Sequence, residues 1–149
     1  MRSTKGFGLI ELMVVLVVAS LLLAIAVPSY NQYTQRARVS AAIGDISKLS
    51  LAIEQYRLRN QDRIPLSLDD LGIEIPEDPW GRAYEYLHIP SAAKGDLRKD
   101  GRLNPLNTDF DLYSLGNDGD TAGPVSAAKS HDDIIRANNG SFIGLGVEY

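Results

Sequence analysis

Four aspartates near the C-terminal end are the residues of this 149-residue chain whose types and spacing come closest to a binding site. They are Asp118, Asp120, Asp132 and Asp133, and glycines stand among them at positions 116, 119 and 123. Carboxylates and backbone carbonyls on a glycine-rich loop suit a hard cation, and calcium accepts irregular shells of oxygen atoms. The spacing is not that of an EF-hand, which needs acids at alternating positions and a closing glutamate. Composition alone therefore favours a solvated acidic loop and leaves a calcium site as the alternative.

The histidines and the absence of cysteine argue against an enzyme. His131 stands beside Asp132, but one histidine in a chain without cysteine makes a poor transition-metal site. The missing cysteines also exclude a disulfide framework, a thiolate zinc site and a cysteine nucleophile. The sequence shows neither a nucleophile elbow nor a glycine-rich phosphate loop. We therefore expect no catalytic residue, and we interpret His88 and Trp80 as structural.

Glu11 is the other group that invites a chemical explanation, because it is the one charge in the apolar run 7–27. A carboxylate within such a run costs several kcal/mol unless it has a partner. One interpretation is that Glu11 lies near a membrane interface, since it follows Phe7 by only four residues. The other is that it pairs with a cation at the start of the helix, which cleavage of a leader would create.

The apolar run has the length and flanks of a membrane segment. At about 1.5 Å per residue, residues 7–27 form a helix of roughly 30 Å, the thickness of a hydrocarbon core. Arg2 and Lys5 precede it, so we expect the N-terminus in the cytoplasm and the rest outside. The chain from Pro28 onward holds 13 of the 15 basic and 18 of the 19 acidic residues, a net charge of −5. That balance excludes nucleic acid as a partner, because no basic stripe is left to neutralise phosphates.

A second helical pattern follows directly. Apolar residues recur at three- and four-residue steps, at Val39, Ala42, Ile43, Ile46, Leu49, Ile53 and Tyr56. We predict one helix from about residue 7 to about residue 59, which Pro28 kinks or locally melts. The remaining 90 or so residues show a helix cap at Ser67, a turn at 78–81 and alternating stretches at 84–89 and 109–114, with a loop over 94–107. The expected fold is α+β, with the long N-terminal helix completing the core of a small antiparallel sheet.

Residues 5–15, Lys-Gly-Phe-Gly-Leu-Ile-Glu-Leu-Met-Val-Val, resemble the class III signal of type IV pilins and pseudopilins. The resemblance implies that a prepilin peptidase cuts after Gly6 and that Phe7 becomes an N-methylated N-terminus. It also implies that Glu11, fifth in the mature chain, pairs with the amine of Phe7 on a neighbouring subunit during assembly. Gly8 departs from the family pattern, where threonine is usual.

The string at 109–119, with Asp-Pro-Trp-Gly upstream and Asp-Asp-Ile downstream, is similar to the major pseudopilin of type II secretion systems. This resemblance implies a leader at 1–6, a transmembrane and filament-core helix at 7–29 and a periplasmic domain at 30–149. The implied function is a structural subunit that polymerises into a periplasmic pseudopilus driving export across the outer membrane. Its implied partners are copies of itself, minor pseudopilins, prepilin peptidase and the inner-membrane assembly platform, with the inner membrane holding the subunit before assembly.

The same resemblance favours a calcium site over a solvated acidic loop at the C-terminal aspartates. Major pseudopilins bind one structural calcium there, which implies the ligands Asp118, Asp132, Asp133 and the carbonyl of Leu115. The stretch 121–131 is several residues longer than usual in the family and leaves the remaining carbonyl ligands unassigned.

Two other functions compete with the secretion pseudopilus. A surface type IV pilin for adhesion or motility shares the N-terminal signal, although it more often carries paired C-terminal cysteines. A membrane-anchored periplasmic enzyme or calcium-binding module needs only an ordinary signal anchor. That third function does not explain Glu11 together with the junction between Gly6 and Phe7.

Overall fold

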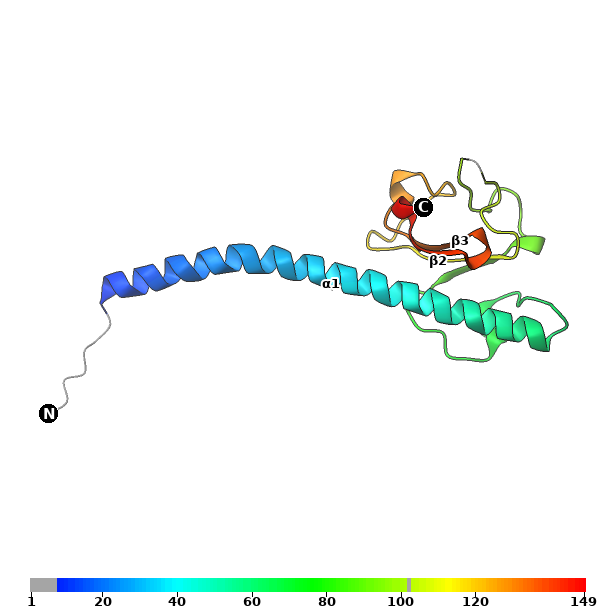
Figure 1. Cartoon of the computed structure of the whole chain (residues 1–149), viewed down its shortest axis with the longest axis horizontal. Helices are drawn as coiled ribbons and strands as arrows, with labels where there is room; N and C mark the ends of the chain where they lie inside the picture. Colours follow the sequence, from blue (N-terminus) through cyan, green and yellow to red (C-terminus); the bar gives the residue numbers. More distant parts are fainter. Residues whose placement is uncertain (1–7, 102) are drawn as a thin grey trace. The chain divides into compact units, whose positions relative to one another are not determined.

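The computed structural model describes residues 8–101 and 103–149. The elements are helix α1 (Leu9–Arg59) and strands β1 (Glu85–His88), β2 (Phe110–Ser114), β3 (Ile134–Ala137) and β4 (Phe142–Leu145), joined by short 3-10 turns (Figure 1). The chain divides after Ala37 into two compact units. The predicted α+β fold, with one long helix packed on a small antiparallel sheet, is confirmed.

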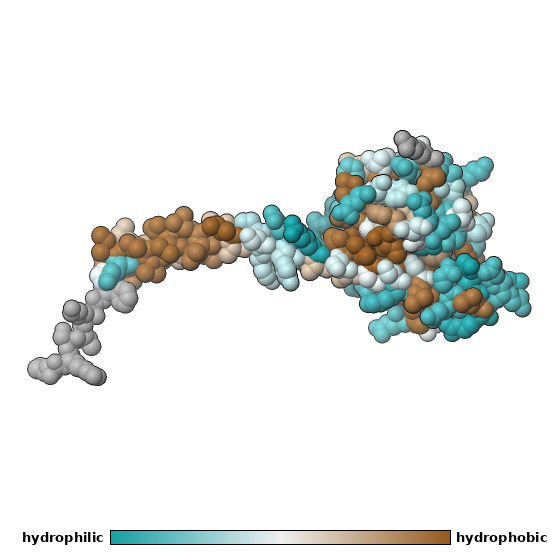
Figure 2. All heavy atoms as spheres, in the orientation of Figure 1, coloured by the Kyte–Doolittle hydropathy of each residue, from teal (hydrophilic) through white to brown (hydrophobic). Residues whose placement is uncertain are grey.

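The first unit is the N-terminal part of α1, and its surface is apolar. Every large apolar side chain from Leu9 to Val27 is between 49% and 82% exposed. Figure 2 shows these residues as a continuous hydrophobic surface. Length and composition make α1 a candidate to cross a membrane. Helix continues on both sides of Pro28, so the expected local melting does not occur.

The second part of α1 buries one face, as the sequence predicts. Ala42, Ile46, Leu49 and Ile53 are buried, with spacings of four, three and four residues. They pack in one cluster with Tyr84, Phe110, Leu112 and Ile134 from the sheet side. The 90 or so residues after α1 therefore obtain their main core from the helix.

The sheet is an antiparallel meander in the order β1-β2-β3-β4. Leu112 of β2 pairs with Tyr86 of β1, and Tyr113 pairs with Ile135 of β3. Side chains alternate between the faces of a strand, so Ile134 joins the helix-facing cluster. Ile135 and Ala137 instead join a second cluster with Leu106 and Val125. The sheet thus separates two small cores.

The local predictions after α1 are mostly confirmed. Ser67 precedes a 3-10 turn at Leu68–Leu71, and its N–H donates to Asp70 Oδ2 at 3.0 Å. The N–H of Gly81 donates to the carbonyl of Asp78 at 2.8 Å, which closes the predicted turn at 78–81. Strands β1 and β2 occupy the two alternating stretches. Strands β3 and β4 were not predicted, and they complete the sheet.

Candidate functional site

The start of α1 holds Glu11 in a local hydrogen bond. The N–H of Gly8 donates to Glu11 Oε2 at 3.0 Å. The carbonyl of Gly8 accepts the N–H groups of Glu11 and Leu12, so Gly8 is the N-cap and Glu11 the third helical residue. This is half of a capping box, because glycine has no side chain to return the bond. The predicted cleavage and methylation residues Gly6 and Phe7 lie outside the described residues.

The acidic loop begins with a tight turn closed by Asp132. Its Oδ2 accepts the N–H groups of Asn117 at 2.8 Å and Asp118 at 2.9 Å. Gly116 has φ +63°, and a Cβ there would lie 2.1 Å from the carbonyl oxygen of Asp132. Only glycine permits that approach, so the two ends of the loop touch at this point.

Arg82 supports the same turn from the neighbouring segment. Its Nη2 donates to the carbonyl of Gly116, and its guanidinium lies beside Gly119. Its Nε lies 3.9 Å from Oδ2 of the buried Asp78, which also accepts the hydroxyl of Ser114 at 2.6 Å. The turn at 78–81 and the acidic loop are therefore parts of one hydrogen-bonded assembly.

Asp133 turns away from Asp132 and is buried. Its Oδ2 accepts Arg98 Nη2 at 2.7 Å and the hydroxyl of Thr121 at 2.5 Å. The side chains of Arg98 and Asp133 are 5% and 0% exposed. Burial raises the pKa of the Asp133 carboxyl, while the bonds from Thr121 and Arg98 favour its ionised form.

The four predicted calcium ligands fit the ion only in part. Asp118 contacts the Asp132 carboxylate through its backbone N–H, and its own Oδ1 accepts the N–H of Asp120 at 2.8 Å. The carbonyl of Leu115 accepts the N–H of Gly119 at 3.2 Å. Oδ2 of Asp133 is bonded to Arg98, whereas its buried Oδ1 accepts no hydrogen bond from the described residues. Within residues 8–101 and 103–149, no three His, Cys, Asp or Glu side chains are arranged to hold a metal. The calcium ion stays a prediction.

Sequence reasoning missed the basic residues of this region. Arg98, Arg82 and Lys129 contact Asp133, the carbonyl of Gly116 and Asp120 respectively. The cluster of aspartates could have indicated that basic partners lie nearby, because a buried carboxylate needs a counter-charge. Sequence does not show which of the 15 basic residues supplies it.

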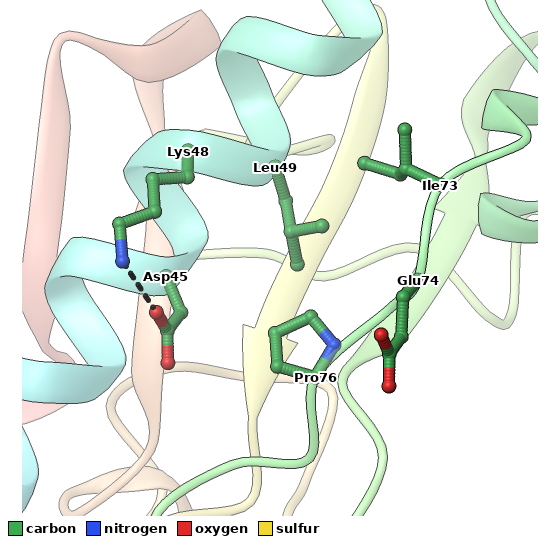
Figure 3. Close-up of a pocket in the computed structure, with 6 residues that line it drawn as sticks. All are labelled: Asp45, Lys48, Leu49, Ile73, Glu74 and Pro76. Atoms are coloured by element: carbon green, nitrogen blue, oxygen red, sulfur yellow. Dashed lines mark hydrogen bonds and ion pairs between the residues drawn. The ribbon is translucent and has the colours of Figure 1, made fainter.

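A groove of about 390 Å³ lies between α1 and the segment 73–76 (Figure 3). Leu49, Ile73 and Pro76 supply its apolar lining, and Asp45, Lys48 and Glu74 supply its polar lining. Asp45 Oδ1 accepts Lys48 Nζ at 3.1 Å and its Oδ2 accepts the hydroxyl of Tyr84 at 3.2 Å. Both carboxylate oxygens of Asp45 thus serve the fold, and the groove carries no catalytic arrangement among the residues that line it.

The chain is similar to known proteins both at its N-terminus and along most of its length. Residues 1–27 match the family described as the prokaryotic N-terminal methylation motif. The chain is 32% identical to the type II secretion system core protein G of Pseudomonas aeruginosa, over 82% of this chain and 89% of that protein. It is 28% identical to the core protein G of Vibrio cholerae, over 86% and 90% respectively.

Fimbrial proteins are also similar, over a shorter stretch. A fimbrial protein of Pseudomonas aeruginosa is 42% identical over 62 residues, which is 42% of this chain and 40% of that protein. No solved structure matches. The similarity to these two core protein G relatives therefore covers more than four fifths of the chain, whereas the similarity to this fimbrial relative covers less than half.

Proposed function

Because this chain belongs to the family of the type II secretion system core protein G, we propose that it is a major pseudopilin. It is a structural subunit that polymerises into a periplasmic filament, and the filament drives protein export across the outer membrane. The observation that carries this proposal is the similarity along more than four fifths of the chain to core protein G of two organisms. The exposed apolar surface from Leu9 to Val27 supports it, since copies of the chain must cover that surface in a filament.

The same surface serves the subunit before assembly. The apolar part of α1, which Arg2 and Lys5 precede in the sequence, supports insertion in the inner membrane, with the N-terminus cytoplasmic and the folded unit periplasmic. Prepilin peptidase then cuts between Gly6 and Phe7, and Phe7 is methylated; the match of residues 1–27 to the methylation motif supports both steps. Minor pseudopilins and the inner-membrane assembly platform are the further partners, and the role is structural rather than enzymatic.

Glu11 acts at the moment of assembly. In the described chain its carboxylate accepts only the N–H of Gly8 and is otherwise exposed. When copies pack together, water is excluded and the carboxylate needs a cation. The new amine of Phe7 on a neighbouring subunit supplies that charge, and the bond with Gly8 holds Glu11 at the end of the helix where this amine arrives.

A surface pilin is the second candidate, and the fimbrial relatives favour it. Their similarity covers less than half of this chain. A deletion strain separates the two functions, because loss of a pseudopilin abolishes export of enzymes, whereas loss of a surface pilin abolishes fibres. Intact export together with missing fibres would overturn the secretion function.

Complementation of the same strain tests the role of Glu11. We expect Glu11→Gln to insert and be cleaved, with a mass that lacks residues 1–6 and carries one methyl group, yet to leave export unrestored. Glu148→Gln, at an exposed carboxylate of the second unit, is the matched control and should restore export. Normal filaments from Glu11→Gln would refute the assembly role.

A further inference from the structure

The buried ion pair between Arg98 and Asp133 joins parts of the chain that are far apart in sequence. Arg98 belongs to the long loop after β1, and Asp133 directly precedes β3. Besides the 2.7 Å bond between the two side chains, the Arg98 guanidinium lies 4.1 Å from the ring centroid of Tyr113. The N–H of Arg98 also donates to Asp111 Oδ2 at 3.3 Å. Arg98 is therefore fixed by the sheet and does not reach Asp133 as a loose surface side chain.

The segment 121–131 contributes a third residue, Thr121, to the hydrogen bonds between Arg98 and Asp133. Thr121 donates its hydroxyl to Asp133 Oδ2 at 2.5 Å and accepts Arg98 Nη1 at 3.2 Å. Ser130 closes this segment on itself, because its hydroxyl accepts the N–H of Ala122 at 3.0 Å and donates to the carbonyl of Ala122 at 2.9 Å. Asp133 Oδ2, at the start of β3, is therefore bonded both to the loop after β1 and to the acidic loop.

We propose that Arg98 supplies at Asp133 the positive charge that a calcium ion would otherwise provide, so that the acidic loop is ordered without a divalent cation. The proposal rests on contacts within this chain and is independent of the filament function. Calcium binds carboxylate oxygens at 2.3–2.6 Å. An ion on Asp133 Oδ2 would stand within about 5 Å of the Arg98 guanidinium, where like charges repel. Displacing Arg98 instead would leave its buried charge without its carboxylate partner.

Elsewhere in the acidic loop, carboxylates and carbonyls are also bonded to donors from this chain. Lys129 pairs with Asp120, and Arg82 donates to the carbonyl of Gly116. The N–H groups of Asn117 and Asp118 stabilise the Asp132 carboxylate. The carboxylates Asp120, Asp132 and Asp133 thus receive hydrogen bonds from donors of the chain itself.

Thermal unfolding of the full chain in detergent micelles tests the proposal. The midpoint is measured in EGTA, in calcium chloride and in magnesium chloride as the control for ionic strength. We expect the three midpoints of the unmodified chain to agree within about 1 °C, since a ligand that does not bind the folded state cannot stabilise it. Arg98→Gln should lower the midpoint by roughly 10 °C or more, because it leaves the buried Asp133 carboxylate without its charge partner.

Three further variants and a calorimetric titration separate the possible outcomes. Lys129→Gln breaks an exposed pair and should shift the midpoint by about 2 °C or less. A midpoint that rises in calcium but not in magnesium, with the rise abolished by Asp133→Asn, would overturn the proposal. If Arg98→Gln does not fold, calorimetric titration of the unmodified chain with calcium decides. We expect no saturable heat, and a one-to-one isotherm that Asp118→Ala removes would overturn the proposal.

Discussion

The residues of α1 before Ala37 and those after it share one helix but differ in what their apolar side chains contact. From Leu9 to Val27 the large apolar side chains remain at least 49% exposed. After Arg38 the apolar face is buried, with Ala42, Ile46 and Ile53 at 0% exposure. Exposed apolar surface of this size must be covered by lipid or by other subunits. One stretch therefore serves membrane and filament contacts, while the other builds the fold.

The same substitution at one leucine in each part of α1 should change stability by very different amounts. Leu49 is 3% exposed and Leu22 is 64% exposed. We expect Leu49→Ala to reduce the free energy of unfolding by about 2–5 kcal/mol, because it leaves a cavity under the helix. Leu22→Ala should change it by about 0.5 kcal/mol or less. Chemical denaturation of both full-length variants in micelles measures this, and equal losses would contradict the division of α1.

A second substitution probes the sheet unit away from the helix. Gly116→Ala places a Cβ against the carbonyl of Asp132 and requires an unfavourable positive φ. We expect a loss of at least about 2 kcal/mol in the free energy of unfolding. Gly95→Ala is the matched control, because no atom lies within 4 Å of its new Cβ. A tolerated Gly116→Ala would show that the two ends of the loop do not meet as described.

The pH dependence of stability should come from the sheet unit. Asp109 accepts Arg136 Nη2 at 2.7 Å, and Arg136 is 3% exposed. Although burial alone would raise it, the hydrogen bonds from Arg136 lower the pKa of Asp109. The folded state then binds fewer protons than the unfolded state, so the pair's contribution is complete above about pH 5 and falls as the pH drops through about 4.

Asp109→Asn checks that assignment. We expect it to cost about 1–2 kcal/mol at pH 7 and to flatten the decline in stability between about pH 5 and pH 3. Urea midpoints of the full chain across this range are the measurement. If the urea midpoint of Asp109→Asn falls with acid as it does in the unmodified chain, other carboxylates must cause that loss of stability.

The smallest effect is expected one residue from the largest. Lys48 neighbours Leu49 in sequence but is 80% exposed, and its bond with Asp45 spans three residues of the helix surface. Lys48→Ala should change the free energy of unfolding by about 0.5 kcal/mol or less. A loss comparable to that of Leu49→Ala would mean that the pair of Lys48 and Asp45, drawn in Figure 3, stabilises the fold more than the exposure of Lys48 indicates.

Local patterns in the sequence were sufficient to predict several elements of the fold. The uninterrupted apolar run predicts the exposed part of α1, and the three- and four-residue steps from Val39 to Tyr56 predict the face that the sheet covers. Strands β1 and β2 follow from alternation, and the turn at 78–81 follows from proline and glycine. Strand β3 escaped prediction because both of its faces are buried, so Ile134 and Ile135 stand side by side without alternation.

The contacts that hold the acidic loop depend instead on how distant segments pack together. Asp132 and Asp133 stand next to each other in the sequence, and the resemblance to major pseudopilins implied that both bind one calcium ion. The two side chains nevertheless have different surroundings, because Asp132 accepts the N–H of Asn117 in the turn while Asp133 is buried beside Arg98. Arg98 lies 35 residues from Asp133 in the chain. No local pattern selects such a partner, because the pairing depends on which loops the packed sheet brings together.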